Sequence, residues 1–297
     1  MNSFSRGWSF LKQAWQMAVK DRDLIKPSIY ALFAGIIVSL IFAPLVVGAS
    51  FLTGGQGNTI GQVVMFVLGA VMIFIQAMVG YIFSGMTVYL IYGYLAEGDG
   101  IMSKAWAVVK RDFFDLMSLA AVTTVVNLVK NAIKGKGKSG IANAAAGLLD
   151  TVWTEASYLI LPSMVIEDFN LKDAVKRAAA IIKDNLLLVG ISMVGVKAVN
   201  SLIGFLLGVL GIGLGLGVGY SIVYVSGAST VGLIGGIGLG VIIAGIFIML
   251  ASIITNYTST AYHTCLYLWA RDVEKARASG STATVEAPAP LAAVLGK

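Results

Sequence analysis

The chain has 297 residues, a formal net charge of +6 and a single cysteine. Only 12% of the residues are charged and 58% are hydrophobic, whereas a soluble domain carries about 25% charged residues. This composition excludes an ordinary soluble fold and indicates lipid as the solvent. Because Cys265 is the single cysteine, an internal disulfide and a paired-cysteine site are excluded. In so apolar a chain, the positive charge favours anionic lipid headgroups, and not nucleic acid, as the partner.

The first predicted element is a short amphipathic helix. Its apolar residues follow the spacing i, i+3, i+4, i+7 of one helix face, and they are Leu11, Ala14, Trp15 and Ala18. Lys12 and Lys20 lie on the opposite face. A helix of this kind lies flat at the level of the lipid headgroups. We therefore expect Trp15 to be an interfacial anchor.

From Ser28 to Ala96 the chain has no Asp, Glu, Lys or Arg. A bilayer core needs about 20 apolar residues for each helix, so this stretch has room for two spans. The break between them is TGGQGNT, residues 53–59, which has turn-forming residues and no charge. The apolar run is too long for a signal-peptide core, so we expect it to remain in the mature protein.

The whole chain is predicted to be all-α, a polytopic membrane helical bundle with about six transmembrane helices. The expected spans are Ser28–Leu52, Ile60–Leu95, Leu116–Ile133, Ile141–Val165, Leu186–Leu210 and Val231–Trp269. The second and the last would be about 54 and 58 Å long as helices. Such lengths predict that these helices protrude into water or contain a break.

The amphipathic pattern recurs twice. The second copy has Met102, Ala105, Trp106 and Val109 on its apolar face, and the third has Leu171, Ala174, Val175 and Ala178. Each copy precedes two predicted spans, so the pattern predicts one membrane domain, 1–275, built from the repeat units 1–96, 97–167 and 168–275. Trp106 would be a second interfacial anchor; the alternative is that these helices are solvated connectors. Residues 276–297 are predicted to form a flexible tail.

Two spans per unit would place both termini and all three amphipathic helices on one side of the membrane. That side carries 16 Lys or Arg, which the positive-inside rule assigns to the cytoplasm. We therefore expect a multi-pass protein of the cytoplasmic membrane. The loop between the third and fourth spans is an unexplained exception, with Lys130, Lys134, Lys136 and Lys138.

Glycines recur every four residues near the C-terminal spans, at Gly211, Gly215 and Gly219 and again at Gly232, Gly236 and Gly240. The run GIGLGLGVG lacks the Lys-Ser/Thr ending and the βαβ context of a phosphate-binding loop. Small residues at this spacing let helices pack closely in lipid. The alternative is a re-entrant or broken segment around 211–230.

Three charged residues fall within or beside predicted spans: Asp150, Glu155 and Lys197. Intramembrane charges are costly and are candidate functional residues. The two carboxylates are separated by about 140° on a helix, so they do not form a paired acid and base. Asp150 shares a polar stripe with Asn143, Thr154 and Ser157. We expect Lys197 to pair with one of the carboxylates, either as a structural contact or beside an ion or solute path; alternatively, Asp150 lies in water.

The most polar stretch of any span is TNYTSTAYHTC, residues 255–265. Asn256, Ser259, Thr260 and His263 share one helical face there. Hydrogen bonding between helices is the common role of such residues, and binding of a solute is the alternative. His263 is the only histidine in the chain, which argues against a histidine-built metal site.

No metal-ligand cluster, GxSxG elbow or activated nucleophile is visible, so we expect no catalytic residue, no metal, no cofactor and no enzymatic activity. The expected role is structural or organising, in a homo-oligomer or with other membrane proteins. The alternative is a transporter or channel that uses the intramembrane Asp, Glu and Lys. A third, weaker hypothesis is a lipid-modifying membrane enzyme with His263 as a proton-transfer residue.

Three stretches carry a resemblance: GWSFLKQAWQMAVKDRDLIKPS, ILPSMVIEDFNLKDAVKRAAAIIKDN and TAYHTCLYLWA. They resemble an uncharacterised family of prokaryotic six-span membrane proteins, which is similar to the membrane domain of some glycerophosphodiester phosphodiesterases. The resemblance covers most of residues 1–275 and implies a multi-pass fold. It implies no activity, and no part of this chain matches the catalytic phosphodiesterase domain.

Overall fold

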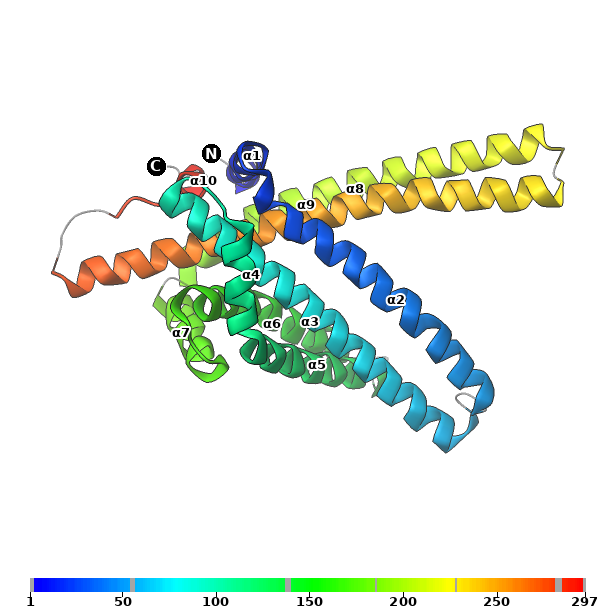
Figure 1. Ribbon diagram of the computed structural model, residues 1–297, viewed down its shortest axis with the longest axis horizontal. Helices are drawn as coiled ribbons and strands as arrows, with labels where there is room; N and C mark the ends of the chain where they lie inside the picture. The colour runs from blue at the N-terminus through cyan, green and yellow to red at the C-terminus, as the bar shows by residue number, and fades with distance from the viewer. Residues whose placement is uncertain are drawn as a thin grey trace. The chain divides into compact units, whose positions relative to one another are not determined.

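The computed structural model describes residues 3–53, 57–136, 140–184, 186–227, 229–280 and 285–295. Within these ranges the chain is helical and contains no strand. The elements, shown in Figure 1, are α1 (Ser3–Lys20), a 3-10 turn η1 (Arg22–Leu24), α2 (Lys26–Leu52), α3 (Thr59–Glu97), α4 (Met102–Arg111), α5 (Phe113–Lys136), α6 (Gly140–Glu167), α7 (Leu171–Asp184), α8 (Leu186–Val225), α9 (Thr230–Ala278) and α10 (Ala289–Leu295).

Among the described residues, five segments are long and apolar enough to cross a bilayer: Arg22–Leu52, Thr59–Glu97, Phe113–Lys134, Val194–Val225 and Thr230–Ala278. They indicate a membrane location. The predicted fourth span, Ile141–Val165, lies within α6, which is not among the five. The reason is the polar stripe of α6, where Asp150 and Glu155 interrupt the apolar sequence. The prediction of six spans is therefore not confirmed.

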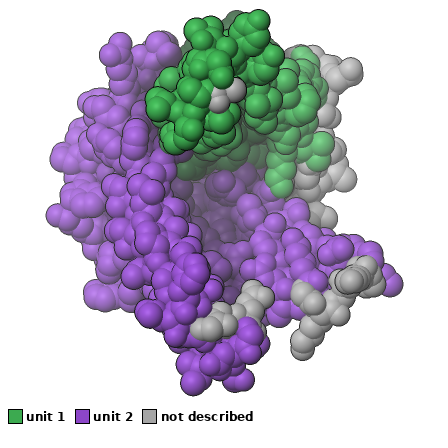
Figure 2. Space-filling view, turned by 90° about the vertical axis from the view of Figure 1, so that its right-hand side faces the viewer, with its two compact units in different colours: residues 1–16, 187–262, 289–297 green, residues 17–186, 263–288 purple. Residues whose placement is uncertain are grey.

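The chain divides into two compact units, coloured separately in Figure 2. Unit 1 comprises residues 1–16, 187–262 and 289–297; unit 2 comprises 17–186 and 263–288. These boundaries differ from those of the three repeat units expected from the sequence. They also fall within α1 and α9, so each of these helices contributes to both units.

In unit 2, α3 contacts α2, α4, α5 and α6. The α3 segment near its C-terminal end is buried, with Met86, Val88, Leu90 and Ile91 at 4% exposure or less. Gly85 allows a close approach there, because a Cβ atom at this position would lie only 3.3 Å from Cγ2 of Val165 in α6. The apolar core of unit 2 therefore surrounds the C-terminal half of α3.

Side-chain hydrogen bonds join three helices of unit 2 at Thr123 in α5. The hydroxyls of Tyr81 in α3 and Thr123 lie 2.7 Å apart. Trp153 Nε1 in α6 donates to the same Thr123 Oγ1 over 2.9 Å. Such bonds satisfy polar groups that lipid cannot, and they fix the register of α3, α5 and α6.

The three short amphipathic helices, α1, α4 and α7, bury the same two positions of the repeated pattern. Ala14, Ala105 and Ala174 are fully buried. One turn later, Ala18, Val109 and Ala178 are at most 4% exposed. The predicted apolar stripe is wider than the buried one, since Trp106 and Val175 are exposed at 43% and 40%. Small side chains at the buried positions let each short helix pack closely.

In unit 1, α8 and α9 form a long antiparallel hairpin (Figure 1). Described residues from Gly211 to Val225 continue α8 without a break, and α9 begins at Thr230. The described residues show no break before the turn that follows Val225, and whether the hairpin is re-entrant stays a prediction. The predicted fifth span, Leu186–Leu210, was too short. Glycine is a poor helix former in water, so the glycine-rich sequence after Leu210 did not indicate a helix. In the structure, packing against the neighbouring helix holds these glycines in α8. The long α3 and α9 are likewise continuous.

Part of the predicted flexible tail is helical. The helix α9 extends to Ala278, and α10 follows at Ala289–Leu295. Leu291 and Val294 of α10 are buried, at 0% and 1% exposure. Their i, i+3 spacing puts them on one helix face, a pair too short for us to recognise as periodic.

Candidate functional site

Glu155 in α6 and His263 in α9 form a buried polar pair in unit 2. The Nε2 atom of His263 lies 2.9 Å from Oε2 of Glu155. Both residues are buried, at 9% and 4% exposure. An ionised Glu155 only accepts hydrogen bonds, so in that state of the pair the proton of this contact lies on Nε2. The structure thus brings together two residues that the sequence placed in separate polar stretches.

Tyr158 covers one face of the His263 ring. The two ring centroids are 4.4 Å apart and the rings are nearly parallel, at 10°. Tyr158 follows Glu155 by three residues, so both lie on the side of α6 that meets His263. Helix α6 therefore fixes the imidazole by a hydrogen bond at its edge and by stacking on its face.

Asp150 pairs with a different residue from the one expected. Lys130 Nζ in α5 donates to Asp150 Oδ1 over 2.6 Å. The described contacts join Asp150 to Lys130 and Glu155 to His263, and the expected pairing of Lys197 with one of the two carboxylates stays a prediction. Lys197 lies on α8 with an exposed side chain. Helix periodicity indicated the polar faces, but it does not say which neighbouring helix faces each one.

Other residues of the 255–265 stretch make hydrogen bonds within unit 1. Ser259 Oγ accepts a hydrogen bond from Asn200 Nδ2 of α8 over 3.1 Å. Asn256 Oδ1 accepts one from Thr260 Oγ1 over 3.4 Å. The hydroxyl of Tyr257 donates to the carbonyl oxygen of Ala14 over 3.0 Å. These bonds connect α8 with α9 and α1 with α9.

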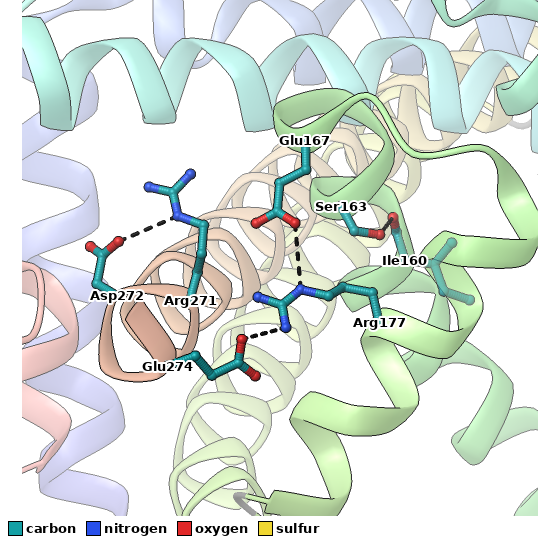
Figure 3. A network of polar contacts seen from close by, with 7 residues as sticks. All are labelled: Ile160, Ser163, Glu167, Arg177, Arg271, Asp272 and Glu274. Atoms are coloured by element: carbon teal, nitrogen blue, oxygen red, sulfur yellow. Dashed lines mark hydrogen bonds and ion pairs between the residues drawn. The ribbon is translucent and has the colours of Figure 1, made fainter. Parts of the chain in front are cut away.

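A network that we did not predict lies in unit 2, where α6, α7 and α9 meet (Figure 3). Arg177 of α7 bonds to Glu274 of α9, and its Nε atom lies 3.4 Å from Oε2 of Glu167 in α6. The Arg177 guanidinium carbon also lies 5.9 Å from the ring centroid of Tyr267. Burial lowers the pKa of Arg177, but Glu274, the hydroxyl of Tyr267 and Glu167 together outweigh it and raise the pKa overall, so the guanidinium stays charged. No local pattern joins residues this far apart in the sequence.

The six predicted packing glycines all lie where a side chain would collide with a neighbour. A Cβ atom on Gly215 would lie 2.4 Å from the carbonyl oxygen of Gly240, and one on Gly219 would lie 2.8 Å from that of Gly236. On Gly211 it would lie 2.6 Å from Cβ of Phe247, and on Gly232 it would meet Ser226. These glycines pack α8 against α9 and the turn between them, within one chain.

The predicted interfacial anchors differ in exposure. Trp106 is 43% exposed, and Lys110 Nζ lies 5.4 Å from the centroid of its ring. Trp15 is half-buried and packs edge-to-face on Tyr257, with centroids 6.0 Å apart. Trp106 is thus available to a lipid interface, whereas Trp15 also packs within unit 1.

Two further observations bear on ligands. Among the described residues, no group of three or more His, Cys, Asp or Glu could hold a metal ion. A groove of about 400 Å³ runs along the α8–α9 hairpin and is lined by apolar side chains and glycines.

Comparisons with models of known protein families and with curated proteins find no match for this chain.

Proposed function

We propose that the chain is a multi-pass protein of the cytoplasmic membrane, without enzymatic activity, that organises a membrane assembly. The observation that supports this most is the recurrence of one short amphipathic helix before each pair of long helices. Ala14, Ala105 and Ala174 are fully buried at the same position of the pattern. On this proposal the chain consists of three units, each an interfacial helix followed by two spans, as in the six-span family that the sequence resembles.

The proposed partners on the cytoplasmic face are anionic lipid headgroups. Several basic residues of α4 and α7 are used within the chain, since Lys104 pairs with Glu97 and Lys176 with Asp173. Lys110, Lys172 and Lys183 are exposed, and Trp106 beside Lys110 supplies an amphipathic ring for the interface. We propose that these residues contact the headgroups.

The assembly contacts are proposed to lie on the outward faces of the hairpin. The six packing glycines are already in contact within the chain, so they cannot also receive a partner helix. A Cβ atom on Gly213 or Gly217 would meet no atom within 4 Å in the described part of the chain. These two glycines lie i, i+4 apart on α8, a spacing that favours helix association in lipid.

The experiment that tests the organising role is extraction of the chain into native-membrane nanodiscs, followed by sizing and crosslinking. We expect an oligomer or a complex with other membrane proteins, and the Gly217→Leu variant should break it while keeping the helical content. The matched control is Gly215→Leu, which should disrupt the fold of the hairpin itself. A chain that is monomeric and without companions in native nanodiscs would contradict the organising role.

The second candidate function is transport of an ion or small solute. The buried pair of Glu155 and His263 favours it, because ionisable groups inside a membrane bundle commonly mark ion paths. Asp150 does not join this pair and bonds instead to Lys130. Transport would therefore depend on Glu155 and not on Asp150, which flux measurements on Glu155→Gln and Asp150→Asn variants would decide.

A further inference from the structure

The buried pair of Glu155 and His263 is costly to keep in an apolar bundle. Removing a carboxylate from water costs several kcal/mol unless it is compensated, and an apolar pair of similar volume would pack without that cost. The contacts described for the imidazole include a hydrogen bond of 2.9 Å to Glu155 and the stacked ring of Tyr158. A carboxylate and an imidazole can bind and release a proton, which apolar side chains at the same buried position cannot do.

Tyr267 lies one turn of α9 beyond His263, on the same helix face. Tyr267 is fully buried. No hydrogen bond of ordinary geometry is described for its hydroxyl, but Arg177 and Glu167 lie close enough to interact with it. Tyr267 therefore supplies a group that can carry a proton, one helix turn from His263 and beside the outer charged residues.

Beyond Tyr267, the same side of α9 meets the charged network of Arg177, Glu167 and Glu274 in unit 2. Arg177 lies over the Tyr267 ring. It also forms ion pairs with Glu167 and Glu274 (Figure 3). Glu167 has 18% of its side chain exposed and Glu274 has 32%. Acid–base groups thus follow one another along α9, from the buried His263 past Tyr267 to the partly exposed Glu274, and Glu167 of α6 lies beside them.

We propose that Glu155 and His263 form a proton-binding site, that Tyr267 connects this site to Glu167 at the aqueous face, and that the ion carried by the chain is the proton. The proposal rests on the transport candidate and names its ion; it is independent of the organising role. In the deprotonated state the imidazole is neutral and the carboxylate is charged. Uptake of one proton makes the imidazolium, and the net charge of the pair rises from −1 to 0.

The relay step conserves protons and leaves Tyr267 unchanged. As its phenolic oxygen accepts a proton from Glu167, it gives its own proton to Nδ1 of His263, because Nε2 already carries the proton donated to Glu155. Among the contacts described, the groups that meet at the site or beside it are Glu155, Tyr158 and Glu167 of α6, Arg177 of α7, and Tyr267 and Glu274 of α9. Arg177 forms ion pairs with Glu167 and Glu274, so it affects how readily these two outer carboxylates bind and release a proton.

The test uses the full chain in liposomes that contain a pH-sensitive dye, with a potassium gradient and valinomycin to drive protons inward. The wild-type chain should acidify the lumen faster than protein-free liposomes do. Glu155→Gln and His263→Gln should abolish this flux, and Tyr267→Phe should lower it roughly tenfold or more, as expected for loss of a positioned proton-transfer group. The matched control is Asp150→Asn on the same helix, which should retain the wild-type rate.

The outcomes separate the failure of the ion assignment from the failure of transport. A wild-type rate equal to that of empty liposomes would overturn the proposal, as would flux that survives Glu155→Gln. Liposomes with potassium- and chloride-sensitive dyes supply the second arm. Flux of either ion without proton flux would keep transport and reject the proton, whereas no flux of any of the three would reject the transport candidate itself. Equal helical content of all variants shows that a lost flux is not a lost fold.

Discussion

Gly215 of α8 and Gly240 of α9 face each other so closely that neither position accepts a side chain. A Cβ atom on Gly215 would lie 2.4 Å from the carbonyl oxygen of Gly240, and one on Gly240 would lie 2.7 Å from that of Gly215. Small residues at such crossings let two backbones meet in lipid, where apolar burial alone gives no driving force for association. The hairpin of unit 1 depends on this contact.

Replacement of Gly215 by alanine should therefore destabilise the hairpin. The added methyl group collides with backbone and not with a movable side chain, so we expect a loss of roughly 1–3 kcal/mol, the usual cost of overpacking. Gly213→Ala is the control, because a Cβ atom there meets nothing within 4 Å; it should gain roughly 0.5–1 kcal/mol. Unfolding in mixed micelles measures both, and equal stabilities of the two variants would refute the close contact.

The ion pair of Lys130 and Asp150 should contribute little to stability. Lys130 is mostly buried, with 17% of its side chain exposed, but Asp150 is 53% exposed. We expect a coupling energy of about 0.2–1 kcal/mol, typical of exposed pairs. A double-mutant cycle with Lys130→Met and Asp150→Asn measures it. Zero coupling here, together with a measurable coupling of Asp150 to Lys197, would support the pairing expected from the sequence.

Asp112, between α4 and α5, should make the protein less stable as the pH rises through the acidic range. Burial raises the pKa of its carboxyl group, and the hydrogen bonds from Arg111 only partly offset this. The folded chain then binds more protons than the unfolded chain, so this contribution is complete below the unfolded value of about 3.9 and is lost as the pH rises through the folded pKa. Asp112→Asn should remove that slope from stability curves measured against pH. An unchanged curve would show that the carboxyl is not desolvated.

Asp173, at the start of α7, should have the opposite effect. The side-chain amide of Asn170 donates to its carboxylate over 2.9 Å, and Lys176 lies 3.2 Å away. Both contacts lower the pKa of Asp173. The stability gained is therefore present above the unfolded value and is lost as the pH falls through the folded pKa. Asp173→Asn should flatten the acid limb of the curve, and Asn170→Ala should mimic it in part; a steeper acid limb in either variant would be inconsistent with this contact.

The helices and their inner faces could largely be predicted from the sequence. The spacing of Ala14 and Ala18, repeated at Ala105 and Val109, indicated positions that the structure shows to be buried. Such patterns are local, since the residues that define a helix face lie within two turns of one another. For the same reason, the glycine spacing indicated close helix packing but not that the contact lies within one chain.

Partners between helices could not be predicted. Glu155 and His263 are 108 residues apart, and periodicity assigns each to a face without saying which helix lies opposite. The network of Arg177 could not be predicted for the same reason, because its carboxylates come from two other helices. The span count depended on α6, whose polar stripe lowers its hydropathy although the helix is 28 residues long.

The most direct test of the three-unit architecture is the side of the membrane on which each short helix lies. In a Cys265→Ser background, single cysteines at Gln16, Ser103 and Ala179, one on each of α1, α4 and α7, would be labelled with a membrane-impermeant thiol reagent in intact cells. Gly57 and Ser229, between long helices, serve as controls. The account predicts that only the two controls are labelled until the membrane is opened. Labelling of Ala179→Cys in intact cells would show that α6 does not cross, and it would contradict the repeat of one interfacial helix and two spans.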